Sequence, residues 1–127
     1  MECPVDKSPM IVLELNMIEI DFCTECSGIW LDSGELELLV GDTEEAAAMI
    51  GSFKSDASST ERKIKCPICR KKMEKVIYSP SENIRIDRCV NGHGLWFDKG
   101  ELHDIINSQD FEGKTEVVEL LRDIFKN

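Results

Sequence analysis

The chain lacks any long apolar run, and its first half has very little positive charge. None of its 127 residues belongs to a stretch approaching the ~20 apolar residues that a membrane-spanning helix requires, so we expect no membrane partner. The start, Met1-Glu2-Cys3-Pro4, lacks the basic and apolar regions of a secretory signal. We therefore expect a cytoplasmic protein. A net charge of −10 argues against a general binder of phosphate backbones.

The composition is that of a small folded protein that holds metal. Hydrophobic residues at 42% and charged residues at 31% exclude wholesale disorder. The length allows one ordinary domain or two very small ones. In a reducing cytoplasm, the six cysteines are expected to be metal ligands rather than disulfides.

Charge is unevenly distributed along the chain. Residues 1–61 carry two basic and 14 acidic side chains, whereas residues 62–106 carry ten basic and six acidic ones. Seven of these bases cluster in sequence: Arg62, Lys63, Lys65, Arg70, Lys71, Lys72 and Lys75. The cluster is interpreted either as a solvated face or as a docking surface for nucleic acid or for the acidic half of another copy.

An internal repeat organises the sequence. The segment 23–36 (CTECSGIWLDSGEL) recurs as 89–102 (CVNGHGLWFDKGEL), and Cys3-Pro4-Val5-Asp6 is matched by Cys66-Pro67-Ile68-Cys69. Alternating apolar residues between these motifs predict a β-hairpin in each copy. Asp32 and Asp98, each followed three residues later by a glutamate, predict a capped helix after each hairpin.

The cysteine spacing predicts two four-ligand metal sites. Cys66, Cys69, Cys89 and His93 form two short-spaced pairs of the kind that a structural zinc site requires. The first copy offers Cys3, Cys23 and Cys26, with Asp6 at the position of Cys69. Ligation by the Asp6 carboxylate is the favoured interpretation; the alternatives are water as the fourth ligand or a partly loaded site. We expect two Zn²⁺ ions per chain, because mixed ligand sets favour zinc over iron.

Other side chains have simpler interpretations. Trp30 and Trp96 are expected to pack in the core beside the metal, with partner recognition as the alternative. His103 has no counterpart in the first copy and is expected not to be a ligand. Apolar residues at helical spacing after Thr115 predict an amphipathic helix. This helix is expected to pack back on the fold, the alternative being self-association or partner docking.

These motifs carry a family resemblance. The cysteine pairs and the Trp-Leu-Asp-x-Gly-Glu-Leu run at Trp30–Leu36 resemble the transcription-factor-IIB-type zinc-finger family, in two tandem copies. The resemblance implies a zinc ribbon with four metal ligands per copy. The expected fold is thus a small metal-stabilised α+β protein: two tandem zinc ribbons, each a β-hairpin plus a short helix, with a C-terminal amphipathic helix. Its segments are a first ribbon with a helical extension (1–50), a linker (51–63), a second ribbon (64–106) and the C-terminal helix (107–127).

The sequence favours a binding protein over an enzyme. A zinc ion with three thiolates and water would resemble a catalytic site, but the sequence shows no general base or substrate pocket beside it. We therefore expect a non-catalytic protein-interaction or adaptor module. The alternative is a nucleic-acid-binding transcriptional regulator that uses the basic stretch 62–75.

Overall fold

The computed structural model describes most of the chain. The described residues are 1–15, 17–41, 44–56, 63–78, 84–108 and 114–125. Within them lie seven strands and four helices, whose bounds are β1 (Ile11–Leu15), β2 (Ile18–Phe22), β3 (Ile29–Asp32), α1 (Glu35–Val40), α2 (Glu44–Gly51), β4 (Phe53–Ser55), β5 (Glu74–Tyr78), β6 (Arg85–Arg88), β7 (Gly94–Phe97), α3 (Glu101–Asn107) and α4 (Lys114–Phe125). No helix among these residues has the length and apolarity to cross a membrane.

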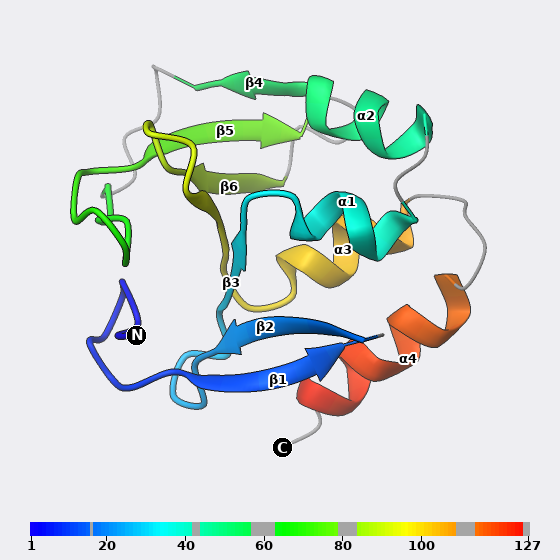
Figure 1. Cartoon of the computed structure of the whole chain (residues 1–127), viewed down its shortest axis with the longest axis horizontal. Coiled ribbons are helices and arrows are strands. Elements are labelled where there is room, and N and C mark those ends of the chain that lie inside the picture. The colour runs from blue at the N-terminus through cyan, green and yellow to red at the C-terminus, as the bar shows by residue number, and fades with distance from the viewer. Residues whose placement is uncertain (16, 42–43, 57–62, 79–83, 109–113, 126–127) are drawn as a thin grey trace.

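The two copies of the repeat join into a single antiparallel sheet. Its strand order is β1-β2-β3-β7-β6-β5-β4, so three strands of the first copy lie beside three strands of the second (Figure 1). The join is the β3–β7 pair, in which Trp30 lies opposite Trp96 and Leu31 lies opposite Leu95. Because Trp30 and Trp96 are equivalent positions of the repeat, the join has the register of an approximate internal two-fold axis.

Two hydrophobic clusters stabilise this sheet. The larger one, the helix-side core, combines strand residues of both copies with buried residues of all four helices, among them Leu36, Met49, Ile105 and Val117. The smaller one, the knuckle core, contains both tryptophans together with Met10, Met73, Cys3, Cys23, Cys66 and Cys89. The cysteine-bearing turns of both copies therefore share one hydrophobic cluster.

The segment between the copies differs from the linker predicted for residues 51–63. Its part at Phe53–Ser55 is strand β4, which pairs with β5 of the second copy. Phe53 is buried, with its ring edge-on to Tyr78 at a centroid distance of 6.1 Å. Aromatic packing and strand pairing therefore override the polar composition around it. Residues 57–62 of the predicted linker lie outside the described residues.

The helix starts also differ from the predicted caps. Helices α1 and α3 begin after Gly34 and Gly100, which adopt left-handed conformations with φ of 92° and 84° and provide no side-chain cap. The carboxylates of Asp32 and Asp98 instead accept hydrogen bonds from the indole Nε1 of Trp30 and Trp96, at 2.9 and 3.1 Å. The other half of each capping box is present: the backbone N–H groups of both aspartates donate to Oε1 of Glu35 and Glu101.

The C-terminal helix packs within the chain. The buried part of its apolar stripe consists of Val117, Val118 and Leu121, which belong to the helix-side core. Helix α4 contacts α3 and β1. The described part of the stripe is thus used for intramolecular packing, as the simpler interpretation of the sequence predicted.

Candidate metal centres

The second copy brings four predicted donors together. Cys66 and Cys69 lie on one turn, and Cys89 and His93 lie on another that follows β6. Their ligand atoms all lie within 4.8 Å of one another. The Sγ atoms of Cys69 and Cys89 are 3.7 Å apart, and Nδ1 of His93 lies 3.5 Å from Sγ of Cys89 and 4.0 Å from Sγ of Cys66.

The first copy forms an equivalent cluster with a carboxylate in it. Cys3, Asp6, Cys23 and Cys26 also place their ligand atoms within 4.8 Å of one another. The Sγ atoms of Cys3 and Cys26 are 3.6 Å apart, and Oδ2 of Asp6 lies 3.5 Å from Sγ of Cys23. The structure thus places Asp6 where the favoured interpretation of the sequence put it.

Both clusters have the dimensions of a tetrahedral zinc site. With Zn–S near 2.3 Å and Zn–N or Zn–O near 2.1 Å, a tetrahedron has S···S edges of ~3.8 Å and S···N or S···O edges of ~3.6 Å. The Sγ–Sγ separations of 3.6 and 3.7 Å and the 3.5 Å separations to Asp6 and His93 agree with these edges. All six cysteines are free thiols. The residues therefore fit zinc, with four protein donors for each ion.

The backbone orients the donors in the same way in both copies. The N–H of Val5 points to Sγ of Cys3, and the N–H of Ile68 points to Sγ of Cys66, each at 3.4 Å. Lys7 and Arg70, at equivalent positions, both have left-handed backbones with φ of 68° and 65°. Such N–H···S contacts stabilise thiolate over thiol, as metal binding requires.

The protonation of the metal-free donors differs between them. Hydrogen bonds from the Ser8 side chain and backbone lower the pKa of Asp6 to about 2, so this carboxylate is charged throughout the neutral range. Burial raises the pKa of the Cys3 thiol, and burial raises that of Cys66 to about 11. A backbone hydrogen bond from Lys71 lowers the pKa of Cys69 to about 6. Binding of a metal ion must therefore displace protons from the buried thiols.

Two supporting residues were not predicted from the sequence. Ser8 donates hydrogen bonds to Oδ1 of Asp6 from both its hydroxyl and its backbone N–H. Nδ2 of Asn91 lies 3.6 Å from Sγ of Cys69. Their positions in the sequence could have indicated these roles. Ser8 follows Asp6 at the spacing of an Asx turn, and Asn91 lies between the donors Cys89 and His93. His103 contacts Asp104, with Nδ1 3.4 Å from Oδ1, and belongs to neither cluster.

The two tryptophans connect the centres instead of serving one copy each. Both are fully buried in the knuckle core. A Cβ on Gly28 would lie 2.1 Å from the Trp96 ring, and a Cβ on Gly94 would lie 2.8 Å from the Trp30 ring. Each indole thus packs on the glycine of the other copy, and the absence of a side chain there allows this contact.

Exposed and buried lysines line one cleft. Lys7, Lys63, Lys65 and Lys72 line a cleft of about 740 Å³ that also contains Lys75, Asp87 and Asp98. Lys75 does not belong with the docking bases predicted from the sequence, because it is buried and its Nζ lies 2.8 Å from Oδ1 of Asp87. Arg62 lies outside the described residues.

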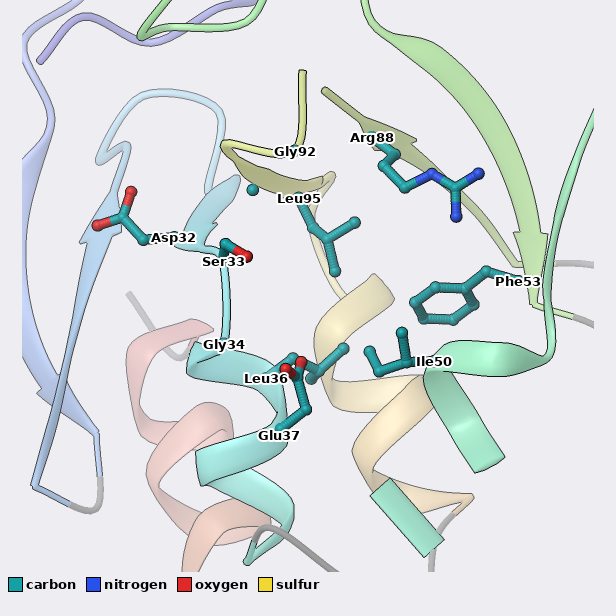
Figure 2. A pocket seen from close by; sticks show the side chains of 11 residues that line it. Asp32, Ser33, Gly34, Leu36, Glu37, Ile50, Phe53, Arg88, Gly92 and Leu95 are labelled. Carbon is teal, nitrogen blue, oxygen red and sulfur yellow. The ribbon is translucent and has the colours of Figure 1, made fainter. Parts of the chain in front are cut away.

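A smaller pocket contains none of the donors. It has a volume of about 150 Å³, and Leu36, Ile50, Phe53 and Leu95 form its apolar side (Figure 2). Arg88 at its rim forms an ion pair with Glu74 at 2.6 Å. The pocket joins α1, α2 and the second copy, and none of its lining residues is a metal donor.

Comparison with known families identifies the repeat. The family described as Transcription factor zinc-finger matches residues 2–41 and, separately, residues 65–108. These two segments are the two copies of the repeat, so the resemblance predicted from the motifs is confirmed. Searches of curated proteins and of solved structures found no match.

Proposed function

Because the chain belongs to the transcription factor zinc-finger family, we propose that it is a non-catalytic protein-interaction module folded around two zinc ions. The observation that carries this proposal is the pair of complete four-donor clusters. A structural zinc site is closed by four protein ligands, whereas a catalytic one keeps a position open for water or substrate. With Asp6 as fourth donor, both sites are of the closed kind.

The packing supports a structural role for the metal ions. Four of the six cysteines belong to the knuckle core with both tryptophans, so metal binding and hydrophobic packing occur at one place. Zinc binding supplies folding free energy in such small domains. We expect two Zn²⁺ ions per chain and a reducing compartment such as the cytoplasm, where free thiols persist.

Native mass spectrometry, combined with affinity capture, tests this function. The purified chain should carry two zinc ions, and strong chelation should remove them with loss of structure by circular dichroism. Zinc-loaded protein should retain a defined protein partner that chelated protein and Cys89→Ser release. Full folding without metal, or turnover of a substrate at either ion, would contradict the proposal.

A second candidate function rests on the lysine-lined cleft. Lys7 from the first copy, Lys65 and Lys72 from the second, and Lys63 just before the second copy line it together, which favours a polyanion such as nucleic acid. Gel-shift titrations with DNA and RNA at several salt concentrations test this candidate. A steep salt dependence that Lys65→Ala with Lys72→Ala weakens, and Lys114→Ala leaves unchanged, would support it. No binding at low salt would dismiss it.

A further inference from the structure

The two copies differ in how their outer strands are covered. β5, the outer hairpin strand of the second copy, pairs with β4. The equivalent strand of the first copy, β1, is the last strand at the other end of the sheet and pairs only with β2 among the described strands (Figure 1). An uncovered strand presents backbone N–H and C=O groups to which a further strand can pair.

Side chains of the uncovered strand β1 are more exposed than their equivalents on β5. Val76 of β5 is fully buried, whereas its equivalent Leu13 of β1 is only partly buried. Ile11 and Val12, at the start of β1, are 45% and 61% exposed. An outer strand with apolar side chains in solvent is typical of a site at which another strand binds.

A groove lies beside the uncovered strand. It has a volume of about 380 Å³, and it is lined by Ile11, Leu13, Glu14 and Leu15 of β1, Phe22 of β2, and Leu120 and Asp123 of α4. Helix α4 follows α3 as α2 follows α1, and α2 contacts β4. The groove between β1 and α4 therefore corresponds to the place that β4 occupies in the second copy.

Strand β4 indicates which side chains such a groove accepts. In the second copy Phe53 pairs with Tyr78, Lys54 with Ile77 and Ser55 with Val76. The equivalent positions of β1 are Leu15, Glu14 and Leu13. A strand added there in the register of β4 would place an aromatic side chain at the groove beside Leu15 and a basic one across from Glu14.

The acidic side chains at the β1 edge favour a basic binding partner. Glu14 is exposed and lies opposite Glu19 on β2, and Asp123 lines the groove. Residues 1–61 carry 14 acidic and two basic side chains, so pairing of this edge with the same edge of a second copy would bring like charges together. A basic segment gains an opposite-charge pair across the strands instead.

We propose that the β1 edge, with the groove beside α4, binds an extended basic segment of a partner protein that places an aromatic residue beside Leu15 and a basic residue across from Glu14. The proposal rests on the proposed interaction function and identifies the surface and the chemistry of the partner. Main-chain hydrogen bonds to β1 supply affinity, and the aromatic and basic side chains supply specificity.

The test uses the full zinc-loaded chain and a labelled peptide, Lys-Lys-Ser-Phe-Lys-Ser-Val-Lys. Saturable binding is expected, with amide hydrogen exchange slowed in β1. Glu14→Arg should weaken binding at least tenfold, and a peptide with glutamate at the central lysine should restore binding to this variant. Because Glu14 faces Glu19, its reversal relieves repulsion and should not impair folding. Glu44→Arg, the same charge change at an exposed position of α2, should alter binding less than twofold.

Each other outcome overturns the proposal. The site is excluded if the peptide does not bind. It is also excluded if binding is unchanged both when the peptide phenylalanine is replaced by alanine and in Glu14→Arg. A concentration-dependent dimer that protects β1 would assign the edge to a second copy. Protection, already in the monomer, of the β1 amides that point away from β2 would assign the edge to the chain itself. If the protein keeps two zinc ions and zinc-dependent partner capture while the peptide fails, the proposed function stands and only this site is wrong.

Discussion

Trp30 and Trp96 lie directly opposite each other across the β3–β7 pair, and each indole ring packs on a glycine of the other copy. Each indole N–H donates to the aspartate two residues further along the chain. The Gly-x-Trp-x-Asp spacing of the repeat thus encodes both a contact within the copy and a contact between copies. Four predictions follow from this arrangement and from the groups around it.

Adding one methyl group at the junction should be severely destabilising. In Gly28→Ala the new Cβ would lie 2.1 Å from the Trp96 ring, which is itself fully buried and cannot move aside freely. We expect a loss of ~3 kcal/mol or more in the free energy of unfolding, measured by urea denaturation of the zinc-loaded protein. Gly51→Ala is the control, because no described residue beyond its own neighbours and helix backbone lies within 4 Å of its Cβ position. Equal stability of the two variants would refute the packing.

Removing the Asp6 carboxylate should release metal from the first site alone. Its oxygen atoms lie within 3.6 Å of Sγ of Cys23. Asp6→Ala should weaken zinc binding there ~10–100-fold or more, since even supporting residues of metal sites have effects of this size. Asp6→Cys, which copies Cys69, should retain the ion. Chelator competition followed by native mass spectrometry would show one ion left in Asp6→Ala. Retention of both ions with unchanged affinity would mean that Asp6 is not a ligand.

Breaking the buried ion pair of the second copy should be costly. Lys75 and Asp87 are 7% and 0% exposed, with Nζ to Oδ1 at 2.8 Å. Lys75→Met removes the cation that lies 2.8 Å from the buried Asp87 carboxylate, and breaking a buried pair on one side costs ~3–5 kcal/mol. The double variant Lys75→Met with Asp87→Leu should recover most of that loss, because it removes both charges. Denaturation curves at pH 7 check this, and a single variant as stable as the wild type would contradict it.

The stability should depend on pH through Glu101. Burial raises the pKa of Glu101 from 4.5 to about 8, so in the folded state this carboxyl binds a proton that the unfolded chain has released. The stabilisation of the folded state by this proton is fully present below pH 4.5 and is lost as the pH rises through 8. Over this range the free energy of unfolding falls by at most ~1.4 kcal/mol per pH unit. Glu101→Gln should flatten the dependence of the free energy of unfolding on pH between 4.5 and about 8, relative to the wild type.

The repeat supplies a control for this pH dependence. Glu35 is the equivalent residue of the first copy, and its side chain also accepts the backbone N–H three residues earlier. Burial raises its pKa as well, but without the large shift of Glu101. Glu35→Gln should therefore change the profile less. An unchanged slope in Glu101→Gln, measured with excess zinc in all samples, would exclude Glu101 as the titrating group.

The metal clusters could be predicted because their information is local. Cys66 and Cys69 lie on one turn, Cys89 and His93 on another, and a single hairpin brings the two turns together. The repeat then transferred this pattern to the first copy, where Asp6 occupies the position of Cys69. Short spacing and one antiparallel hairpin are features that a sequence shows directly.

The join between the copies could not be predicted in this way. Trp30 and Trp96 would show the same apolar pattern in two separate ribbons as in one continuous sheet, because each is buried in either case. β4 was missed for a related reason: three residues, Phe53–Ser55, lie in a polar stretch, and their strand forms only because β5 offers an edge. The predicted aspartate caps were wrong because an indole N–H competes for the same carboxylate.

The position of the β3–β7 pair bears on the order of folding. Trp30 and Trp96 are 66 residues apart in the sequence, so among the strand pairs of the sheet this one requires the largest loss of chain entropy. Each hairpin, in contrast, closes over a short loop and can be held by its own ion. We expect the two halves to form first as metal-bound pieces and to meet last at the tryptophans, so that the complete sheet appears only after both ions are bound.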